Sequence, residues 1–225
     1  MFVGKFFKKI NQKNKNHYFS GLSFNSKNVK KNNIFFSIRG TKINGNKYIK
    51  ESIKKGASTI VSNLNFQGKK NSVLYIKTKS PRKLLSEIAS KFYKYKPLNL
   101  VAVTGTNGKS SVADFYLQIL KLNNKKAASI GTLGVKTYLK NLKISNTTLD
   151  PILLNKHLQN IKKHKIDNVI LEASSHGLKQ HRLDGLNFNI GIFTNLSRDH
   201  LDYHKSYKDY LSSKLLLFNN LLKKN

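Results

Sequence analysis

Short hydrophobic runs dominate the first part of the chain. Runs rich in Ile, Val, Phe and Leu lie at 34–40, 58–63 and 72–77, and polar segments separate them. Runs of this length, enriched in β-branched and aromatic residues, are typical of β-strands. A basic amphipathic segment between the first two runs predicts a helix. The pattern as a whole therefore predicts a small α/β domain.

A helix and a domain boundary follow the last of these runs. Ser80 and Pro81 are a typical N-cap and first-turn proline, and they predict a helix that ends shortly before Pro97. The hydrophobic pattern changes after this second proline. We therefore expect one domain over residues 1–97 and a second over residues 98–225.

Strand-like and helix-like patterns alternate in the second domain. That order predicts a mostly parallel sheet with crossover helices, and hence an α/β fold with a doubly wound sheet of the phosphate-loop type. In such sheets the chemistry gathers where the strands end. The expected strands lie at 99–105, 127–135, 168–175 and 189–197, and the expected helices at 110–120, 150–164 and 206–218.

A glycine-containing loop, GTNGKSS, connects the first strand of this domain to its first helix. Gly105 and Gly108 allow backbone amides to turn inward, and the helix N-terminus attracts the same anion. Lys109 would meet the β- and γ-phosphates of ATP, and the Ser110 hydroxyl would reach Mg²⁺. The loop therefore predicts ATP binding. The expected ATP-binding residues are Gly105, Thr106, Asn107, Gly108, Lys109, Ser110 and Ser111.

The spacing of this loop is shorter than the common one. The pattern GxxxxGK[ST] would need a glycine at the position of Val103. The alternative hypothesis is a strand-to-helix turn whose lysine only faces solvent. The apolar strand before the loop and the helix after it favour phosphate binding.

Acidic residues are rare in this chain, which has only ten in 225 residues. Glu172 nevertheless stands at the end of an apolar strand, and Asp199, His200, Asp202 and His204 follow another strand end. A Mg²⁺ ion that bridges ATP oxygens needs one or two carboxylates. The alternative is that these groups cap helices and pair with lysines. Beside a phosphate loop, metal coordination is the better interpretation.

The net charge of +32 raises the question of nucleic-acid binding. Of the 42 basic residues, however, only Arg39, Arg82, Arg182 and Arg198 are arginine, the residue best suited to bidentate contacts with phosphates and bases. The lysines are spread along the whole chain and form no cluster. We therefore expect no nucleic-acid partner, although the charge suits anionic substrates.

Cysteine is absent from the sequence, and no window reaches the apolar length of a membrane span or of a signal-peptide core. These features predict a cytoplasmic protein without membrane insertion. The hydrophobic content of 39% is enough for a sizeable core. Any bound metal must use oxygen or imidazole ligands.

Four blocks of sequence together resemble the Mur ligase family. They lie at 104–111, 146–148, 171–182 and 193–204, and they include the stretches TGTNGKSS and LEASSHGLKQHR. The last two blocks are most similar to members that add the third residue of the peptidoglycan peptide. The resemblance implies an ATP-dependent amide ligase that joins meso-diaminopimelate or L-lysine to UDP-N-acetylmuramoyl-L-alanyl-D-glutamate through an acyl phosphate. We expect a monomer, and the choice between the two diamino acids stays open.

The resemblance also implies roles for individual residues. Lys109, Glu172, His200 and Lys214 would be catalytic. Ser110, Glu172 and His200 would bind Mg²⁺, together with Lys214 once that lysine is carbamylated. Carbamylation is needed because a protonated amine cannot be a metal ligand.

Contacts to the nucleotide-sugar peptide are expected in both domains. The part in the first domain departs most from the family, which usually has an acidic residue and an arginine where Asn25 and Lys27 stand. The uridine end of the substrate is expected at Phe24, Ser26, Thr41, Lys42 and Ile43, and the peptide end at Asn146, Thr147, Thr148, Ser174, Gln180 and Arg182.

The chain ends shortly after the helix that contains Lys214. We therefore expect it to be the N-terminal part of a longer ligase and inactive by itself, because the family's C-terminal domain, which recognises the amino acid, has no counterpart in this sequence. Three other hypotheses stay open. They are a related ligase such as a folylpolyglutamate synthetase, an inactive remnant, and a basic binding module without catalysis.

Overall fold

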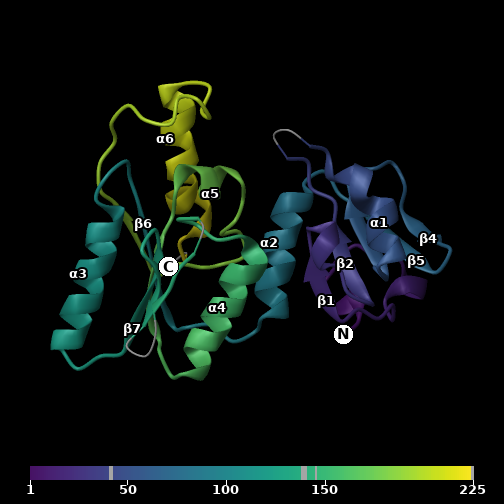
Figure 1. Cartoon of the computed structure of the whole chain (residues 1–225), viewed down its shortest axis with the longest axis horizontal. Coiled ribbons are helices and arrows are strands. Elements are labelled where there is room, and N and C mark those ends of the chain that lie inside the picture. Colours follow the sequence, from purple (N-terminus) through teal and green to yellow (C-terminus); the bar gives the residue numbers. More distant parts are fainter. Residues whose placement is uncertain (41–42, 138–140, 145, 224–225) are drawn as a thin grey trace. The chain divides into compact units, whose positions relative to one another are not determined.

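The computed structural model describes residues 1–40, 43–137, 141–144 and 146–223, and the chain divides into two compact units (Figure 1). The first unit is Met1–Phe92 and the second is Tyr93–Asn225. The boundary expected at residue 97 stays a prediction. Both units are α/β, as the alternation of hydrophobic patterns predicts.

The first unit contains a five-stranded sheet in the order β1-β2-β3-β5-β4. All neighbours are parallel except β4 and β5. The three hydrophobic runs of the sequence form β2, β3 and β5, whereas β1 and β4 are only three residues long and carry no clear hydrophobic signal. The strands are β1 (Gly21–Ser23), β2 (Asn33–Phe36), β3 (Thr59–Ser62), β4 (Gly68–Lys70) and β5 (Val73–Lys77).

Two helices belong to this unit, α1 (Ile49–Lys54) and α2 (Pro81–Phe92). The second begins at the predicted proline. Every residue of β2 and of β3 is buried, which is the pattern of parallel strands covered on both faces. Short 3₁₀ helices lie at Val3–Lys5, Gln12–Asn14, Ser26–Asn28 and Gly45–Tyr48.

The second unit contains a six-stranded sheet in the order β11-β6-β10-β7-β8-β9. The first four strands of this order are mutually parallel, as predicted. The strands are β6 (Asn99–Thr104), β7 (Ala127–Gly131), β8 (Gly134–Thr137), β9 (Asn141–Leu142), β10 (Asn168–Glu172) and β11 (Ile190–Phe193). The helices are α3 (Lys109–Leu122), α4 (Pro151–Lys163), α5 (Ser175–Lys179) and α6 (Tyr207–Leu216), and one π-helical turn follows at Leu217–Leu221.

The prediction of a single strand over 127–135 was wrong. This segment folds back on itself as β7 and β8, an antiparallel pair. Gly134 has φ +103°, a backbone conformation that favours glycine, and a Cβ atom there would lie 2.2 Å from the Leu142 carbonyl oxygen. The apolar residues on both sides of the turn hid the reversal, because no Asn-Gly or Pro-Gly pair marks it.

Alternate residues of the central strands face opposite layers of helices. Leu100 and Ala102 belong to the large core that includes residues of α4, whereas Val101 and Val103 pack with Ala113 of α3. Figure 1 accordingly shows α3 and α4 on opposite sides of the sheet. The four parallel strands end next to one another, and the loops that follow them form the candidate site.

Candidate active site

The phosphate loop leaves β6 through two glycines that no other residue could replace without strain. Gly105 has φ +146° and Gly108 has φ +83°. A Cβ atom on Gly105 would lie 1.9 Å from Oγ1 of Thr194, at the end of the adjacent strand β11. The loop therefore passes against its neighbour at backbone distance, and α3 begins immediately afterwards at Lys109.

Neighbouring segments hold the loop in place. The backbone amides of Thr106 and Asn107 donate to the backbone oxygen and the side-chain oxygen of Asn195, both at 3.0 Å. The Thr106 hydroxyl lies 3.1 Å from the hydroxyl of the buried Tyr210, on α6. The Ser197 amide also donates to this threonine hydroxyl, at 3.0 Å. Segments that are far apart in sequence thus set the loop's conformation.

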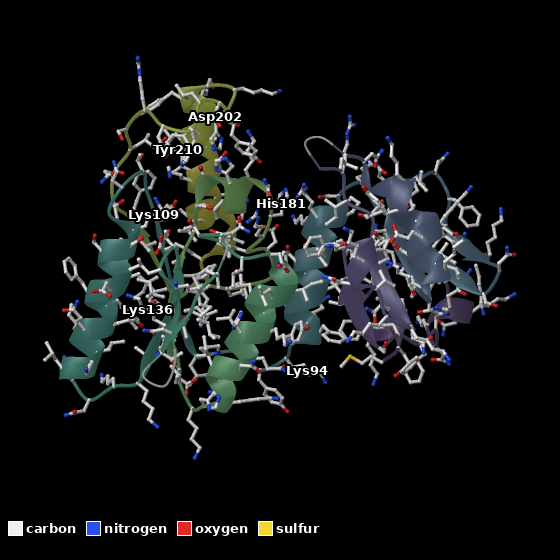
Figure 2. All side chains as sticks on the ribbon, in the orientation of Figure 1. Lys94, Lys109, Lys136, His181, Asp202 and Tyr210 are labelled. Carbon is white, nitrogen blue, oxygen red and sulfur yellow. The ribbon has the colours of Figure 1, made fainter. Side chains whose placement is uncertain are left out.

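Lys109 folds back over the loop that precedes it. Its Nζ donates to the carbonyl oxygens of Gly105 at 3.0 Å and Thr106 at 2.7 Å. Burial lowers the pKa of Lys109, while the charges of Glu172 and Asp199 oppose that shift. The amine thus lies over the loop, at the end of α3 where Figure 2 labels Lys109.

Glu172 is almost completely buried at the end of β10, and hydrogen-bond donors surround its carboxylate. Oε2 accepts from the hydroxyls of Ser110 at 3.1 Å and Thr132 at 3.0 Å. Oε1 accepts from the backbone amide of Thr132 at 3.0 Å. Gly131 leaves room for this group, because a Cβ there would lie 2.1 Å from Oε1. The sequence pointed to Glu172 but not to Gly131 or Thr132.

Lys214 is buried on α6, with 1% of its surface exposed. Its Nζ donates to the Gly105 carbonyl oxygen at 2.6 Å and lies 4.4 Å from the centre of the Tyr210 ring. Burial, followed by the charge of Lys109, lowers the pKa of Lys214 to about 8. The lysine that looks like one surface residue among many in the sequence is therefore part of the site.

His200 lies in the same pocket as the loop, Glu172 and Lys214. Its backbone has φ +53°, and its Nε2 is 3.5 Å from the carboxylate of Asp199. The ring of His176 approaches it edge-on, at 5.0 Å between centroids.

The neighbouring His204 has a different position. It is buried between α5 and α6, with Nε2 3.0 Å from the Ser175 hydroxyl and Nδ1 3.4 Å from that of Ser213. His204 therefore pairs with serine hydroxyls of the two helices, whereas the alternative hypothesis expected lysine partners.

Residues that the sequence analysis expects at the peptide end of the substrate form one connected group beside Glu172. The Thr148 hydroxyl donates to the Glu172 backbone oxygen at 2.8 Å and lies 3.0 Å from the Ser174 hydroxyl. Arg182 donates to the Thr148 backbone oxygen at 2.5 Å and to Oε1 of Gln180 at 2.9 Å. The Thr147 hydroxyl lies 3.0 Å from that of Thr132.

The remaining expected substrate residues lie in a loop of the second unit and in the first unit. Asn146 is exposed in the loop that precedes Thr147. Phe24 and Ile43 are exposed and Ser26 is buried, all in the first unit. Of the remaining predictions for the uridine end, Thr41 and Lys42 lie outside the described residues. The contacts expected of the first unit stay predictions.

The donor set suits a hard cation in part. Ser110 and Glu172 offer oxygen atoms 3.1 Å apart, and His200 offers an imidazole. Lys214 offers no oxygen as an amine. Among the residues that the structure describes, no three His, Asp or Glu side chains come together in a way that could hold a metal ion. A Mg²⁺ ion at this place would therefore need water molecules or phosphate oxygens as further ligands.

A glycine loop at the end of a parallel strand, two lysines over it and a buried carboxylate beside it define a protein of the phosphate-loop α/β class. Profile comparison agrees with this class. The Mur ligase middle domain matches residues 103–225, and the catalytic domain of the Mur ligase family matches residues 18–93. The chain belongs to the Mur ligase family.

Curated relatives point in the same direction. The chain is 43% identical over 215 residues to the UDP-N-acetylmuramoyl-L-alanyl-D-glutamate–2,6-diaminopimelate ligase of Rickettsia montanensis, covering 93% of the chain and 44% of that relative. It is 40% identical to the ligase of the same name from Bradyrhizobium diazoefficiens, covering 90% of the chain and 41% of the relative. The chain thus spans less than half the length of these relatives.

Solved structures share the fold. A structure of UDP-N-acetylmuramoyl-L-alanyl-D-glutamate–2,6-diaminopimelate ligase matches with a TM-score of 0.80 and 29% identity, over 96% of this chain and 44% of the other. MurF ligase from Thermotoga maritima in complex with ADP matches with a TM-score of 0.58 and 18% identity, over 87% of this chain and 42% of the other, which supports the fold alone. Within the described residues, no helix combines the length and the apolar character needed to cross a membrane.

The space that Gly131 leaves for the Glu172 carboxylate can be tested with Gly131→Ala. A methyl group at residue 131 would collide with the buried carboxylate, so we expect a loss of about 1–3 kcal/mol in the free energy of unfolding, measured by urea denaturation. The matched control is the same substitution in a Glu172→Ala background, where the colliding atoms are gone. An equal loss of stability in both backgrounds would show that the loss does not come from a collision with Glu172.

The burial of Lys214 predicts a pH-dependent contribution to stability. Its pKa is about 8 in the folded chain against 10.5 for the free group, so between these values the unfolded chain binds more protons and stability rises with pH. The stability of the wild type relative to Lys214→Met should therefore increase from pH 8 to pH 10 in urea unfolding. Lys208→Met, at an exposed lysine of the same helix, is the control. A difference that stays constant with pH would contradict the burial of a shifted amine.

Proposed function

We propose that this chain is the nucleotide- and substrate-binding part of an ATP-dependent ligase that adds a diamino acid to UDP-N-acetylmuramoyl-L-alanyl-D-glutamate. The reaction belongs to peptidoglycan precursor synthesis, and we place it in the cytoplasm, where ATP is supplied. The names of the relatives favour 2,6-diaminopimelate over lysine as the amino acid. The observation that carries the proposal is the convergence of Lys109 and Lys214 on the Gly105 carbonyl, beside the carboxylate of Glu172.

The phosphate loop binds and orients the triphosphate. The backbone amides at the start of α3 and the Lys109 amine offer hydrogen-bond donors to the β- and γ-phosphates. The Lys109 amine gives up the Gly105 and Thr106 carbonyls, its partners in the loop, when an anion takes their place. Because phosphoryl transfer is catalysed mainly by position and charge neutralisation, these contacts account for most of the loop's contribution.

The peptide group beside Glu172 binds the acceptor. Arg182, tied to the Thr148 backbone and to Gln180, is suited to a carboxylate of the substrate. The γ-phosphoryl group passes to the D-glutamate side-chain carboxylate and forms an acyl phosphate. The incoming amine then attacks the acyl carbon, and inorganic phosphate leaves. Thr147 and Ser174 line the pocket and hold the acceptor in line with the triphosphate.

Ser110 and Glu172 would hold a Mg²⁺ ion, and His200 with a carbamylated Lys214 would hold a second. When bound, these ions neutralise the charge of the phosphate oxygens. Carbamylation joins the Lys214 nitrogen to the carbon of CO₂, and the amine loses a proton to solvent. Its lowered pKa of about 8 favours the unprotonated amine that this step needs. The resulting carbamate carries the oxygen atoms for metal binding that the Lys214 amine lacks.

The proposed function is tested by phosphate release from ATP in the polypeptide that joins this chain to the rest of the ligase. Release should require both the UDP-muramoyl dipeptide and diaminopimelate. Lys109→Ala should lower kcat/KM by about a hundredfold or more, which corresponds to about 2.7 kcal/mol of transition-state stabilisation. Lys121→Ala, on the opposite end of α3, is the matched control and should keep the wild-type rate. Phosphate release that ignores the dipeptide, or that survives Lys109→Ala, would contradict the proposal.

A further inference from the structure

Thr132 makes two hydrogen bonds to the Glu172 carboxylate, and the proposed function gives it no role. It follows β7, 40 residues before Glu172, and its own surface is largely exposed to the pocket. Its backbone amide donates to Oε1 and its hydroxyl donates to Oε2, both at 3.0 Å. Thr132 therefore forms a hydrogen bond to each oxygen of the carboxylate and fixes the plane of the group.

The adjacent Gly131 makes these two hydrogen bonds possible. At Gly131 a Cβ would lie 2.1 Å from Oε1 and 2.4 Å from Cδ of Glu172. The absence of a side chain lets the carboxylate approach the backbone closely enough to accept the Thr132 amide. Gly131 and Thr132 together form a seat whose shape and donors both match a carboxylate.

The hydroxyl of Thr132 also fixes the direction of a hydrogen-bond chain. A hydroxyl has one proton, and that of Thr132 is used on Glu172 Oε2. The contact of 3.0 Å between the hydroxyls of Thr132 and Thr147 must then be donated by Thr147. Thr147 consequently presents only lone pairs to the pocket, and it suits an N–H group of the bound peptide and not a carbonyl oxygen.

We propose that Thr132 is a positioning residue of this ligase. It holds the Glu172 carboxylate in the orientation that binds the nucleotide-bound cation, and it sets Thr147 as a hydrogen-bond acceptor for the substrate. The inference rests on the proposed function, because it assigns Thr132 a role in the same site. Residues that orient a metal-binding group typically change metal affinity by about tenfold to a hundredfold when their hydrogen bond is removed.

The test measures binding of Mn²⁺ with ADP to the 225-residue chain, by electron paramagnetic resonance of the free ion. Thr132→Val keeps the shape and the backbone amide but removes the hydroxyl, so we expect binding of Mn²⁺ to weaken by about tenfold or more. Thr132→Ser restores the hydroxyl and should return the affinity to within about threefold of wild type. Urea unfolding of each variant separates a loss of binding from a loss of folding.

Thr147→Val is the comparison that distinguishes orientation from general damage to the pocket wall. Thr147 contacts the Thr132 hydroxyl but has no hydrogen bond to either carboxylate oxygen. We expect its substitution to change Mn²⁺ affinity by less than about threefold. Equal affinities for wild type and Thr132→Val, or failure of Thr132→Ser to recover, would overturn the role of Thr132. Failure of the wild type to bind Mn²⁺ with ADP at all would overturn the proposed function itself, and with it this inference.

Discussion

A single backbone carbonyl, that of Gly105, is the point on which the site depends. It accepts hydrogen bonds from the amines of both Lys109 and Lys214. Two cationic side chains on one oxygen repel each other, and the charge of Lys109 is one cause of the lowered pKa of Lys214. An anion at the mouth of the loop relieves this repulsion. Lys109 is thus the lysine that suits a phosphate group, whereas the same repulsion favours the uncharged Lys214 amine that carbamylation needs.

The order of the strands makes this arrangement possible. Because β11 and β10 flank β6, the loops that follow all three meet at one edge of the sheet. The close approach of Gly105 to Thr194 fixes the loop against the end of β11, and the pairing of β10 with β6 brings Glu172 next to α3. Tyr210, from a helix much later in the chain, then closes the far side of the loop. The same topology that buries the core therefore also sets the distances in the site.

Much of the fold and the centre of the site could be predicted from the sequence. The parallel strands have continuous apolar runs, and the glycines, Lys109 and Glu172 stand at strand ends, where such chemistry is expected. Lys214 and His200 needed the family resemblance, because neither spacing nor composition separates them from other residues of their kind. The structure confirms that both lie in the pocket with the phosphate loop. Their roles in catalysis and metal binding stay proposals.

The features that sequence reasoning missed depend on contacts through space. Thr132 touches a residue 40 positions later, and Tyr210 touches the loop 104 positions earlier. The turn between β7 and β8 has a glycine at positive φ but none of the residue pairs that usually mark a hairpin. Local sequence patterns do not predict contacts between residues so far apart in the chain.

The central claim is that the glycine loop and Lys109, whose amine lies on the Gly105 carbonyl, form a binding site for the phosphates of a nucleotide. The most direct measurement is the free energy of unfolding of the 225-residue chain with and without Mg²⁺ and ADP. At a ligand concentration of about 100 times Kd, binding to the folded chain adds about 2.7 kcal/mol, so the urea midpoint should rise in the wild type and stay unchanged in Lys109→Met. A midpoint that does not move in the wild type, or that moves equally in Lys109→Met, would contradict the account.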